Sequence, residues 1–586
     1  MSFIDFQTKY DITHKKSMHI HHCCNILSLI RFLLFILVIV FLLLGYFWQN
    51  VCYGLAGVAL IAFLIVVKVH HHYKKQDVYI DALQQVYLKH LQRQKGKWKD
   101  FEECGNTFLD EHDYKSFDLD ILGKNSLYQM ICLAFTSQGK KQLASDLIND
   151  HCYEDMKERQ KAVKELANHP ELVIQLETLG SLIPRQKKDS IENWLYSIQN
   201  QSVRSISLFL FLFPLIVCLS LLCVCFHWFM PYSQIILEAG VVLQLCIAFF
   251  FYFRHQALFE PIAYLSTGLE SYAQCYAQIV NNLFTSGYLQ KLQKQLTEQE
   301  DVVFAIHQLS SISQKVIYRH NIFAFIILNG LGLFDFYIHY QYAQWLKQYQ
   351  HAIPVWFEVL AKFESLMSLS VLKIDQFDVV LPEIQKEKTL VFTHLCHPLI
   401  DPQQVVGNDF EMSDSLCVIT GSNMSGKTTF MRSIGLNLVL AYAGGFVFGK
   451  SLSCSPMHMM TSMRVKDNVE EGISTFYGEL LRIKEMIEYA KKQQPMICFI
   501  DEIFKGTNSL DRIAGAKATI EKLSLPYAYT FLTTHDLELG QLKKQNYHFD
   551  EYYQDEHICF DYKIKKGVSQ SSNGQFLLKQ VGILDK

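Results

Sequence analysis

The stretch SLCVITGSNMSGKTTF, residues 415–430, decides how the C-terminal part of this chain folds. It contains the spacing G-x-x-x-x-G-K-[ST] from Gly421 to Thr428, directly after an apolar run typical of a β-strand and directly before a helical pattern. Glycines at both ends let the backbone curl, so that consecutive N–H groups and the N-terminus of the following helix face a phosphate group. The stretch therefore predicts a phosphate-binding loop.

Two side chains of this loop have separate predicted roles. The Lys427 ammonium supplies positive charge to β- and γ-phosphate oxygens, and the Thr428 hydroxyl is a ligand for Mg²⁺. We expect the whole loop to bind the nucleotide. Its residues are Gly421, Ser422, Asn423, Met424, Ser425, Gly426, Lys427, Thr428 and Thr429.

Acidic and imidazole side chains follow two further apolar runs. Residues 497–500 form a strand-like run that ends in Asp501 and Glu502. In this arrangement the aspartate holds Mg²⁺, and the glutamate orients or deprotonates the attacking water. A second run, residues 527–533, is followed closely by His535, which we expect to sense the γ-phosphate or position the water. The predicted site therefore has Glu502 and His535 as catalytic groups and Thr428 with Asp501 as Mg²⁺ ligands.

The region around these motifs has the rhythm of a layered α/β domain. From about residue 389 onward, short β-rich runs alternate with helical stretches and Gly-bearing turns. We therefore expect an α/β nucleotide-binding domain over residues 389–586. The predicted strands are Leu390–Phe392, Ser415–Thr420, Met496–Ile500 and Tyr527–Thr533.

The rest of the chain predicts membrane helices and soluble helices. Apolar runs at 27–48, 51–69, 205–226 and 235–253 are each about as long as a bilayer-spanning helix, and they predict two hairpins, 27–69 and 205–253. Lys and Arg flank the hairpins and are absent from their turns, which places both termini, residues 1–26 and the polar regions in the cytoplasm. Residues 74–200 and 255–375 are expected to be helical. A shorter run, Ile322–Phe334, is expected to be a buried soluble helix.

Composition adds little about partners. A formal net charge of -3 gives no global basic signal for nucleic acid. The sixteen cysteines include no C-x-x-C pair, so neither a disulfide framework nor a zinc ribbon is indicated. His- and Cys-rich groups lie before the first span, at 19–24, and after the second, at 70–72. Metal binding is chemically possible there, but interfacial polar residues beside membrane helices explain them without any ligand spacing.

Together these segments resemble the MutS family of ATPases. Residues 421–447 are similar to its Walker A segment, 472–480 to its signature segment and 497–512 to its Walker B segment, while 534–539 and 562–583 are similar to its last motifs. Upstream, 117–147 and 156–166 resemble the start of the family's helical core, and 328–349 its long lever helix. The resemblance is closest to a membrane-associated, shortened branch of the family.

This resemblance implies an ABC-like P-loop ATPase domain that follows an all-α core and lever region. It implies ATP with Mg²⁺, and a homodimer in which Ser474 reaches the γ-phosphate bound by the partner and helices from Gly567 onward clasp that partner. It also implies a role in DNA mismatch repair and mismatched-DNA binding. One departure matters: residues 1–73 are expected to be an anchor, so no mismatch-reading domain with a Phe-x-Glu wedge is expected.

Three functions compete at this point. The first is a multi-pass inner-membrane ATPase whose dimer clamps DNA and is switched by ATP. The second is a membrane scaffold that uses ATP-dependent dimerisation without binding DNA. The third is an ABC-type transporter, against which the sequence has no LSGGQ-like segment and its largely apolar hairpins offer no polar path.

Overall fold

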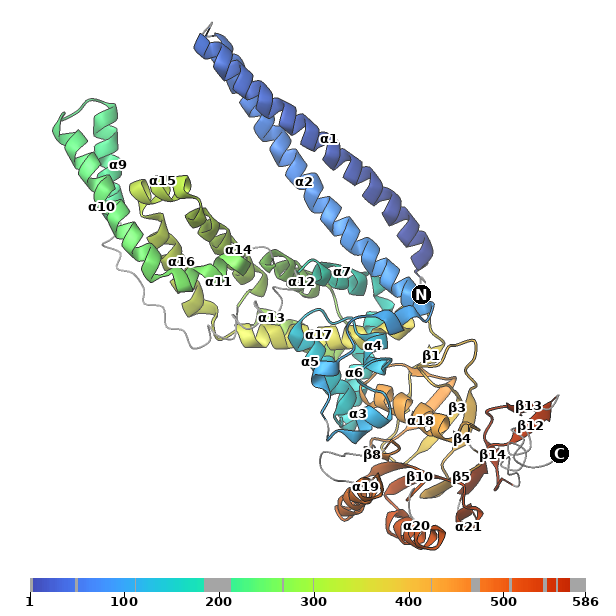
Figure 1. Ribbon diagram of the computed structural model, residues 1–586. Helices are drawn as coiled ribbons and strands as arrows, with labels where there is room; N and C mark the ends of the chain where they lie inside the picture. The colour runs from blue at the N-terminus through green and yellow to red at the C-terminus, as the bar shows by residue number, and fades with distance from the viewer. Residues whose placement is uncertain are drawn as a thin grey trace.

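The computed structural model shows two helical hairpins, a helical region and a C-terminal α/β domain (Figure 1). Both hairpins project away from the α/β domain, which lies at the opposite end of the molecule. The structure describes residues 4–47, 51–110, 112–183, 212–265, 268–298, 300–422, 424–464, 475–504, 508–540, 545–554 and 557–569.

The first hairpin consists of two long helices, α1 (Phe6–Phe47) and α2 (Val51–Gln94). Their apolar halves pack on each other but leave most of their large side chains exposed, as in Phe32 and Ile61. α2 then continues without a break from the predicted span into the helical region, so the hairpin and the soluble part share one rigid helix.

The second hairpin is formed by α9 (Leu212–Cys225) and α10 (Tyr232–Arg254). By length and composition, three helices in the described residues are able to cross a membrane, namely α1, α2 and α10. The sequence predicts four spans. The other predicted span, residues 205–226, corresponds to α9. Only 14 residues of this helix are described, because residues 205–211 lie outside the described part of the chain.

Two expectations for residues 322–349 are wrong. Ile322–Phe334 is not a buried helix: α15 (Ile322–Gly332) exposes most of its apolar side chains and buries only Asn329 and Gly330. Nor is 328–349 one long helix, because α15 and α16 (Phe334–Tyr349) meet at 83°. The break falls at Leu333, which adopts a left-handed backbone with φ 46°.

The prediction of a helical N-terminal region is confirmed. Several of its helices begin at side chains that accept a hydrogen bond from a backbone N–H three residues on, as Asp113, Ser126 and Thr136 do. Its first part contains α3 (Tyr114–Asp118), α4 (Leu127–Ile131), α5 (Ser137–Ile148), α6 (Tyr153–Asn168), α7 (Pro170–Ser181) and the 3₁₀ turns Lys97–Asp100 and Asn106–Phe108. Its second part contains α11 (Gln256–Leu265), α12 (Leu269–Asn281), α13 (Gly287–Thr297), α14 (Val302–Ile317), the 3₁₀ turn Tyr318–His320, α16 and α17 (Ile353–Ile374).

The C-terminal domain is built on a six-stranded sheet with the order β14-β11-β5-β10-β9-β8. Every residue of its three central strands is buried. The strands are β8 (His458–Ser462), β9 (Met496–Asp501), β5 (Leu416–Thr420), β10 (Ala528–Thr534), β11 (Gln545–His548) and β14 (Lys565–Lys566). All the pairs except β11 with β14 are parallel. The carboxyl ends of β5, β10 and β9 therefore lie at one edge.

Helices and smaller sheets complete this domain. The helices are α18 (Lys427–Tyr442), α19 (Thr475–Ala490), α20 (Ser509–Leu523) and α21 (Leu537–Gly540). A four-stranded sheet has the order β2-β7-β3-β4, from Glu383–Ile384, Ser451–Cys454, Leu390–Leu395 and Asn408–Glu411. Two-stranded pairs join β1 (Val379–Val380) to β6 (Val447–Phe448) and β12 (Glu551–Gln554) to β13 (His557–Phe560).

Candidate functional site

The loop between β5 and α18 has the conformation that its glycines predict. Gly421 and Gly426 have φ values of 143° and 110°. A Cβ on Gly421 would lie 2.8 Å from the Phe549 carbonyl oxygen, so a side chain there would meet backbone rather than a movable group. The loop thus needs glycine at this position both for its φ and for its close approach to the chain at Phe549.

Lys427 lies at the first position of α18 and is buried. Its Nζ donates to the carbonyl oxygens of Gly421 and Ser422, at 2.9 and 2.7 Å. These bonds hold the ammonium inside the curl of the loop, where the N-terminus of α18 also points. A negatively charged group bound in the loop would meet a lysine that is already in place.

Two oxygen-bearing side chains meet where β5 and β9 end. The Thr428 hydroxyl donates to Asp501 Oδ2 at 2.8 Å. The other oxygen of Asp501 accepts from the hydroxyl of Thr533, on the intervening strand β10. Hydroxyl and carboxylate oxygens suit a hard cation such as Mg²⁺, so the two predicted ligands are together and chemically fit for it.

The two predicted catalytic groups also lie together. His535 Nε2 is 2.7 Å from Glu502 Oε1. The register of the sheet explains this pairing, because Thr533 lies beside Asp501 and the next residues of both strands turn out at the same edge. The Glu502 N–H donates to the backbone and hydroxyl oxygens of Thr533, at 3.1 and 3.0 Å, which fixes a residue with φ 52°.

A pocket of about 510 Å³ opens beside the loop and contains the predicted residues Met424 to Thr429 together with Glu502. Part of its lining was missed by sequence reasoning. These residues are His397, Ile400, Gln404, Val405, Val406, Asn408, Phe430, Ser433, Phe549 and Tyr562. Burial lowers the pKa of His397 to about 4, so its imidazole is neutral at pH 7. The dipeptide His397-Pro398 after a β-rich run is the sequence signal that marks this loop.

Other predicted residues of the loop differ in exposure. Ser425 is buried, and the Ser422 hydroxyl donates to Glu551 Oε2 at 2.7 Å. Met424 is 87% exposed, which suits a residue that meets a ligand or a partner rather than the core. Asn423 and Ser474 lie outside the described residues, as do residues 570–586, where the clasping helices are predicted.

The described part of the signature-like segment, in α19, contacts the chain just after β9. Glu479 of this helix accepts a hydrogen bond from the Phe504 N–H, at 2.6 Å, two residues after Glu502. A movement of α19 would therefore displace the backbone next to Glu502.

A polar joint links the helical region to the same domain. Asp118, fully buried at the end of α3, accepts from Arg482 of α19 at 2.9 Å and from the Met463 N–H at 2.9 Å. Asp120 pairs with Arg432 of α18 and with Arg464. Sequence reasoning missed this joint because the two sides are more than 300 residues apart.

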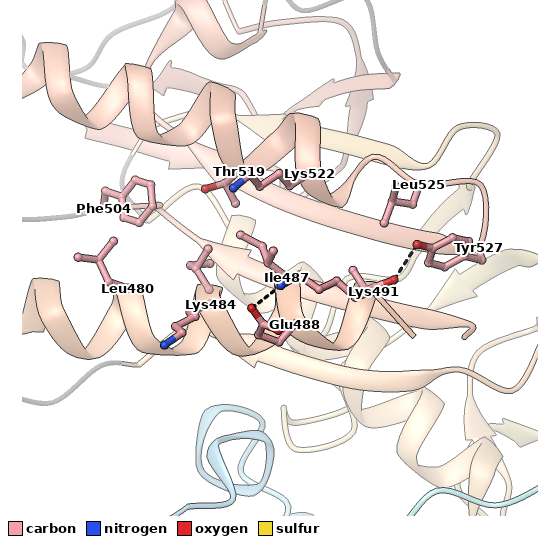
Figure 2. Close-up of a pocket in the computed structure, with 12 residues that line it drawn as sticks. Leu480, Lys484, Ile487, Glu488, Lys491, Phe504, Thr519, Lys522, Leu525 and Tyr527 are labelled. Carbon is pink, nitrogen blue, oxygen red and sulfur yellow. Dashed lines mark hydrogen bonds and ion pairs between the residues drawn. The ribbon is translucent and has the colours of Figure 1, made fainter. Parts of the chain in front are cut away.

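A second hollow, of about 620 Å³, lies between α19 and α20 rather than at the loop. Figure 2 shows Leu480 and Ile487 of α19 facing Phe504 and the end of α20, with Lys484, Lys491 and Lys522 around them. Lys491 is paired with Glu488 at 2.7 Å. None of the predicted phosphate, Mg²⁺ or catalytic residues lines it, so this hollow is separate from the pocket beside the loop.

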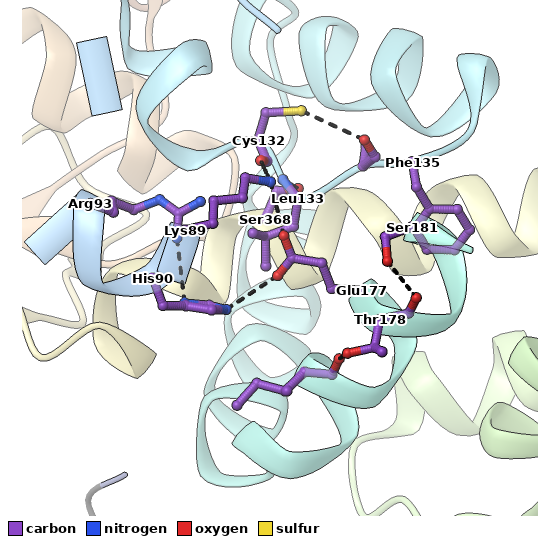
Figure 3. Close-up of polar contacts among 12 residues, drawn as sticks. Lys89, His90, Arg93, Cys132, Leu133, Phe135, Glu177, Thr178, Ser181 and Ser368 are labelled. Carbon is purple, nitrogen blue, oxygen red and sulfur yellow. Dashed lines mark hydrogen bonds and ion pairs between the residues drawn. The ribbon is translucent and has the colours of Figure 1, made fainter. Parts of the chain in front are cut away.

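A buried charged cluster joins α2 to the end of α17. Figure 3 shows Lys89 and His90 directed at Glu177 of α7, at 2.8 and 3.2 Å. The other ring nitrogen of His90 meets Asp375, which also binds Arg93 at 2.7 Å. Asp375 ends α17, and β1 of the C-terminal domain begins four residues later.

The two His-rich groups beside the first hairpin each contact a polar residue of the opposite helix. His21 lies 3.5 Å from Asp77, and His70 lies 3.4 Å from Arg31, across the two helices. Among the residues that the structure describes, no group of three or more His, Cys, Asp or Glu side chains is placed to hold a metal ion. The contacts present are hydrogen bonds and ion pairs between polar residues.

Comparison with known proteins identifies the domain. Residues 417–584 match the family model of MutS domain V. The DNA mismatch repair protein MutS of Aquifex pyrophilus is 31% identical over 236 residues, which are 38% of this chain and 27% of that protein. The chain thus spans about a quarter of the curated relative it matches.

The phosphate loop, the Thr428–Asp501 contact and the Glu502–His535 pair define a candidate nucleoside-triphosphate site in a domain of the MutS domain V type. The C-terminal part of the chain is therefore similar to MutS domain V, and a helical region precedes it.

Proposed function

We propose that this protein is a membrane-anchored MutS-type ATPase, in which ATP binding and hydrolysis switch a homodimer that associates with DNA. The observation that carries the proposal is the Glu502–His535 pair, 2.7 Å apart, beside the phosphate loop and the Thr428–Asp501 contact. One pocket thereby combines a group for the phosphates, oxygen ligands for a cation and a base for water.

The proposed reaction is attack of water on the γ-phosphate. Lys427, held by two loop carbonyls, would bind the β- and γ-phosphate oxygens. Glu502 would accept a proton from the attacking water, and His535 would orient the Glu502 carboxylate through their hydrogen bond. Mg²⁺, held by Thr428 and Asp501, would neutralise charge on the phosphates when bound.

Dimerisation through the ATPase domains would complete the site. Ser474 of each subunit, which directly precedes α19, would reach the γ-phosphate bound by the other subunit. The bond from the Phe504 N–H to Glu479 supports this, because it ties α19 to the strand that carries Glu502. Binding of ATP in one subunit would then affect the position of the segment that carries Glu502 in the other subunit.

The test of the proposal is ATP turnover by the detergent-solubilised protein with no DNA, matched duplex, mismatched duplex and branched DNA. We expect turnover that requires Mg²⁺ and changes when DNA is added. Turnover that does not change with any of these DNAs would favour the membrane scaffold. Absence of turnover would contradict the proposed enzyme.

Anchoring through the two hairpins gives a prediction about topology. Epitope tags inserted near residues 49 and 230 should be accessible to antibody in sealed spheroplasts, because the positive charges flank the other ends of the hairpins. Tags near residues 150 and 500 should become accessible only after permeabilisation. A tag near residue 500 that is accessible from outside would contradict the proposed orientation.

A further prediction concerns DNA selectivity. Before the helical core, the described residues form only α1 and α2, and this hairpin offers no aromatic wedge to open a base step. We expect binding through phosphate contacts, which falls steeply with salt and prefers a mismatch over matched duplex by less than about tenfold, or about 1.4 kcal/mol. A titration over a range of salt with both duplexes measures this, and a larger preference would reveal a lesion-reading element.

A further inference from the structure

Helix α15 presents an apolar surface that the rest of the described chain leaves uncovered. None of its 11 residues is charged, and Ile322, Phe323, Ile326 and Ile327 are 67%, 76%, 47% and 59% exposed. Four large apolar side chains side by side on a short helix cost free energy in water, at roughly 25 cal/mol for each Å² of apolar area. Such a surface indicates a contact partner.

The last turn of α15 packs against the second hairpin. A Cβ on Gly330 would lie 3.5 Å from the side chains of Val241 and Leu245 of α10, and Cys218 of α9 contacts the Leu331 carbonyl oxygen at 3.8 Å. Figure 1 shows α15 lying beside this hairpin. The exposed apolar side chains of α15 therefore belong to a helix that contacts α10, whose Val242 is 61% exposed.

α15 is too short to cross a bilayer. A helix of 11 residues is about 16 Å long, against about 30 Å of hydrocarbon. It also cannot continue into α16, because the two meet at 83° and α16 buries most of its residues in the soluble helical region.

Buried polar contacts at the bend between α15 and α16 hold the two helices at this angle. The Asn329 side chain accepts from the Asp335 N–H at 3.0 Å, and Asp335 pairs with Arg319 at 2.7 Å. The Arg319 guanidinium lies over the ring of Tyr252, at the end of α10. Backbone N–H groups at the start of α15 also have hydrogen-bond partners, because the Asn321 side chain accepts from the Phe323 and Ala324 N–H groups. The N–H groups of Phe323, Ala324 and Phe325 thus have partners within the chain, which suits a helix in contact with lipid.

We propose that α15 lies in the interface of the lipid bilayer, roughly parallel to its plane, with Phe323 and its apolar neighbours inserted among the acyl chains. The inference rests on the proposed anchoring through the second hairpin, which would bring α15 to the membrane surface. A lipid surface fits better than a protein partner because α15 packs directly against α10, a helix long and apolar enough to cross a membrane. Interfacial helices bind in this way, by burying one face at the boundary between headgroups and acyl chains.

The test uses the full-length protein in phosphatidylcholine vesicles with one fluorescent amino acid placed at Phe323, at Val242 of α10 or at the 82% exposed Leu510 of α20. The vesicles contain lipids with a quencher near the glycerol backbone or near the chain end. We expect the probe at 323 to lose most of its fluorescence with the shallow quencher, the probe at 242 with the deep quencher, and the probe at 510 with neither. Placing the probe at Ile327 repeats the measurement if the 323 variant does not fold.

The outcomes separate this inference from the anchoring. A probe at 323 that is unquenched while 242 is quenched would overturn the interfacial placement and leave the anchor intact; a second copy of the chain covering α15 would give this result. Strongest quenching of 323 by the deep quencher would also overturn it, because the helix would then be inserted across the membrane. No quenching at 242 would overturn the anchoring, and the inference with it.

Discussion

Replacing Glu502 with Gln is expected to lower kcat for ATP hydrolysis by about 100- to 10,000-fold, the usual contribution of a general base. The amide keeps the shape of the side chain and can still bond to His535, but it cannot accept a proton from water. Binding of ATP should remain, because Lys427 and the loop backbone are unchanged. Steady-state turnover in detergent, with retention of labelled ATP on the isolated protein, measures both quantities.

Two further variants sharpen this prediction. Lys427→Ala removes the buried ammonium from the loop and should abolish retention of ATP as well as turnover. Glu521→Gln makes the same chemical change at an exposed site on α20 and should leave both unaffected. Turnover by Glu502→Gln equal to that of the unaltered protein would remove Glu502 from the proposed base position.

The phosphate loop and its partners could be predicted because their information is local. Gly421 to Thr428 is one contiguous stretch, and its glycines have the positive φ values that this spacing requires. All four predicted strands of the C-terminal domain occur, with ends within a few residues of those expected. Parallel pairing of β9 with β10 and of β10 with β5 then brings Asp501 and His535 to the loop without further assumptions.

The rest of the pocket could not be predicted in this way. Phe549 and Tyr562 lie more than 100 residues after the loop and carry apolar or aromatic side chains, which in a sequence are indistinguishable from core residues. The buried joint at Asp118 and Asp120 could not be predicted either, because its arginines lie more than 300 residues further along the chain.

The apolar pattern of Ile322–Phe334 was misleading for another reason. Hydrophobicity alone does not tell a buried helix from one that faces lipid or solvent, and here most of the side chains are exposed. The break at Leu333 depends on the contacts of Asn329 with Asp335 and of Asp335 with Arg319, which tertiary structure supplies.

Replacing Asp375 with Asn is expected to destabilise the folded protein by about 3–5 kcal/mol, the usual cost of removing one partner from a buried ion pair. Asp375 is buried with both of its cationic partners, Arg93 and His90, whose side chains are fully buried. In the variant, the buried Arg93 and His90 side chains lose the negative charge of their partner, and water cannot reach them to compensate. Because the cluster joins α2 to the end of α17, we expect the apparent Tm in detergent to fall markedly. The matched control is Asp378→Asn, an exposed aspartate three residues further on, which should change the Tm little.

The stabilisation should also depend on pH through His90. Burial alone would lower the pKa of this imidazole, but attraction and hydrogen bonding from Asp375 and Glu177 outweigh it and raise the pKa above its ordinary 6.5. A raised folded pKa stabilises the protein fully below the unfolded value, and this stabilisation is lost as pH rises through the folded pKa. The Tm difference between the unaltered protein and Asp375→Asn should therefore be largest near pH 6 and shrink as the pH rises. A difference that is constant or grows with pH would show that His90 is not held as a cation by Asp375, and that the joint between the first hairpin and the ATPase domain depends on Arg93 alone.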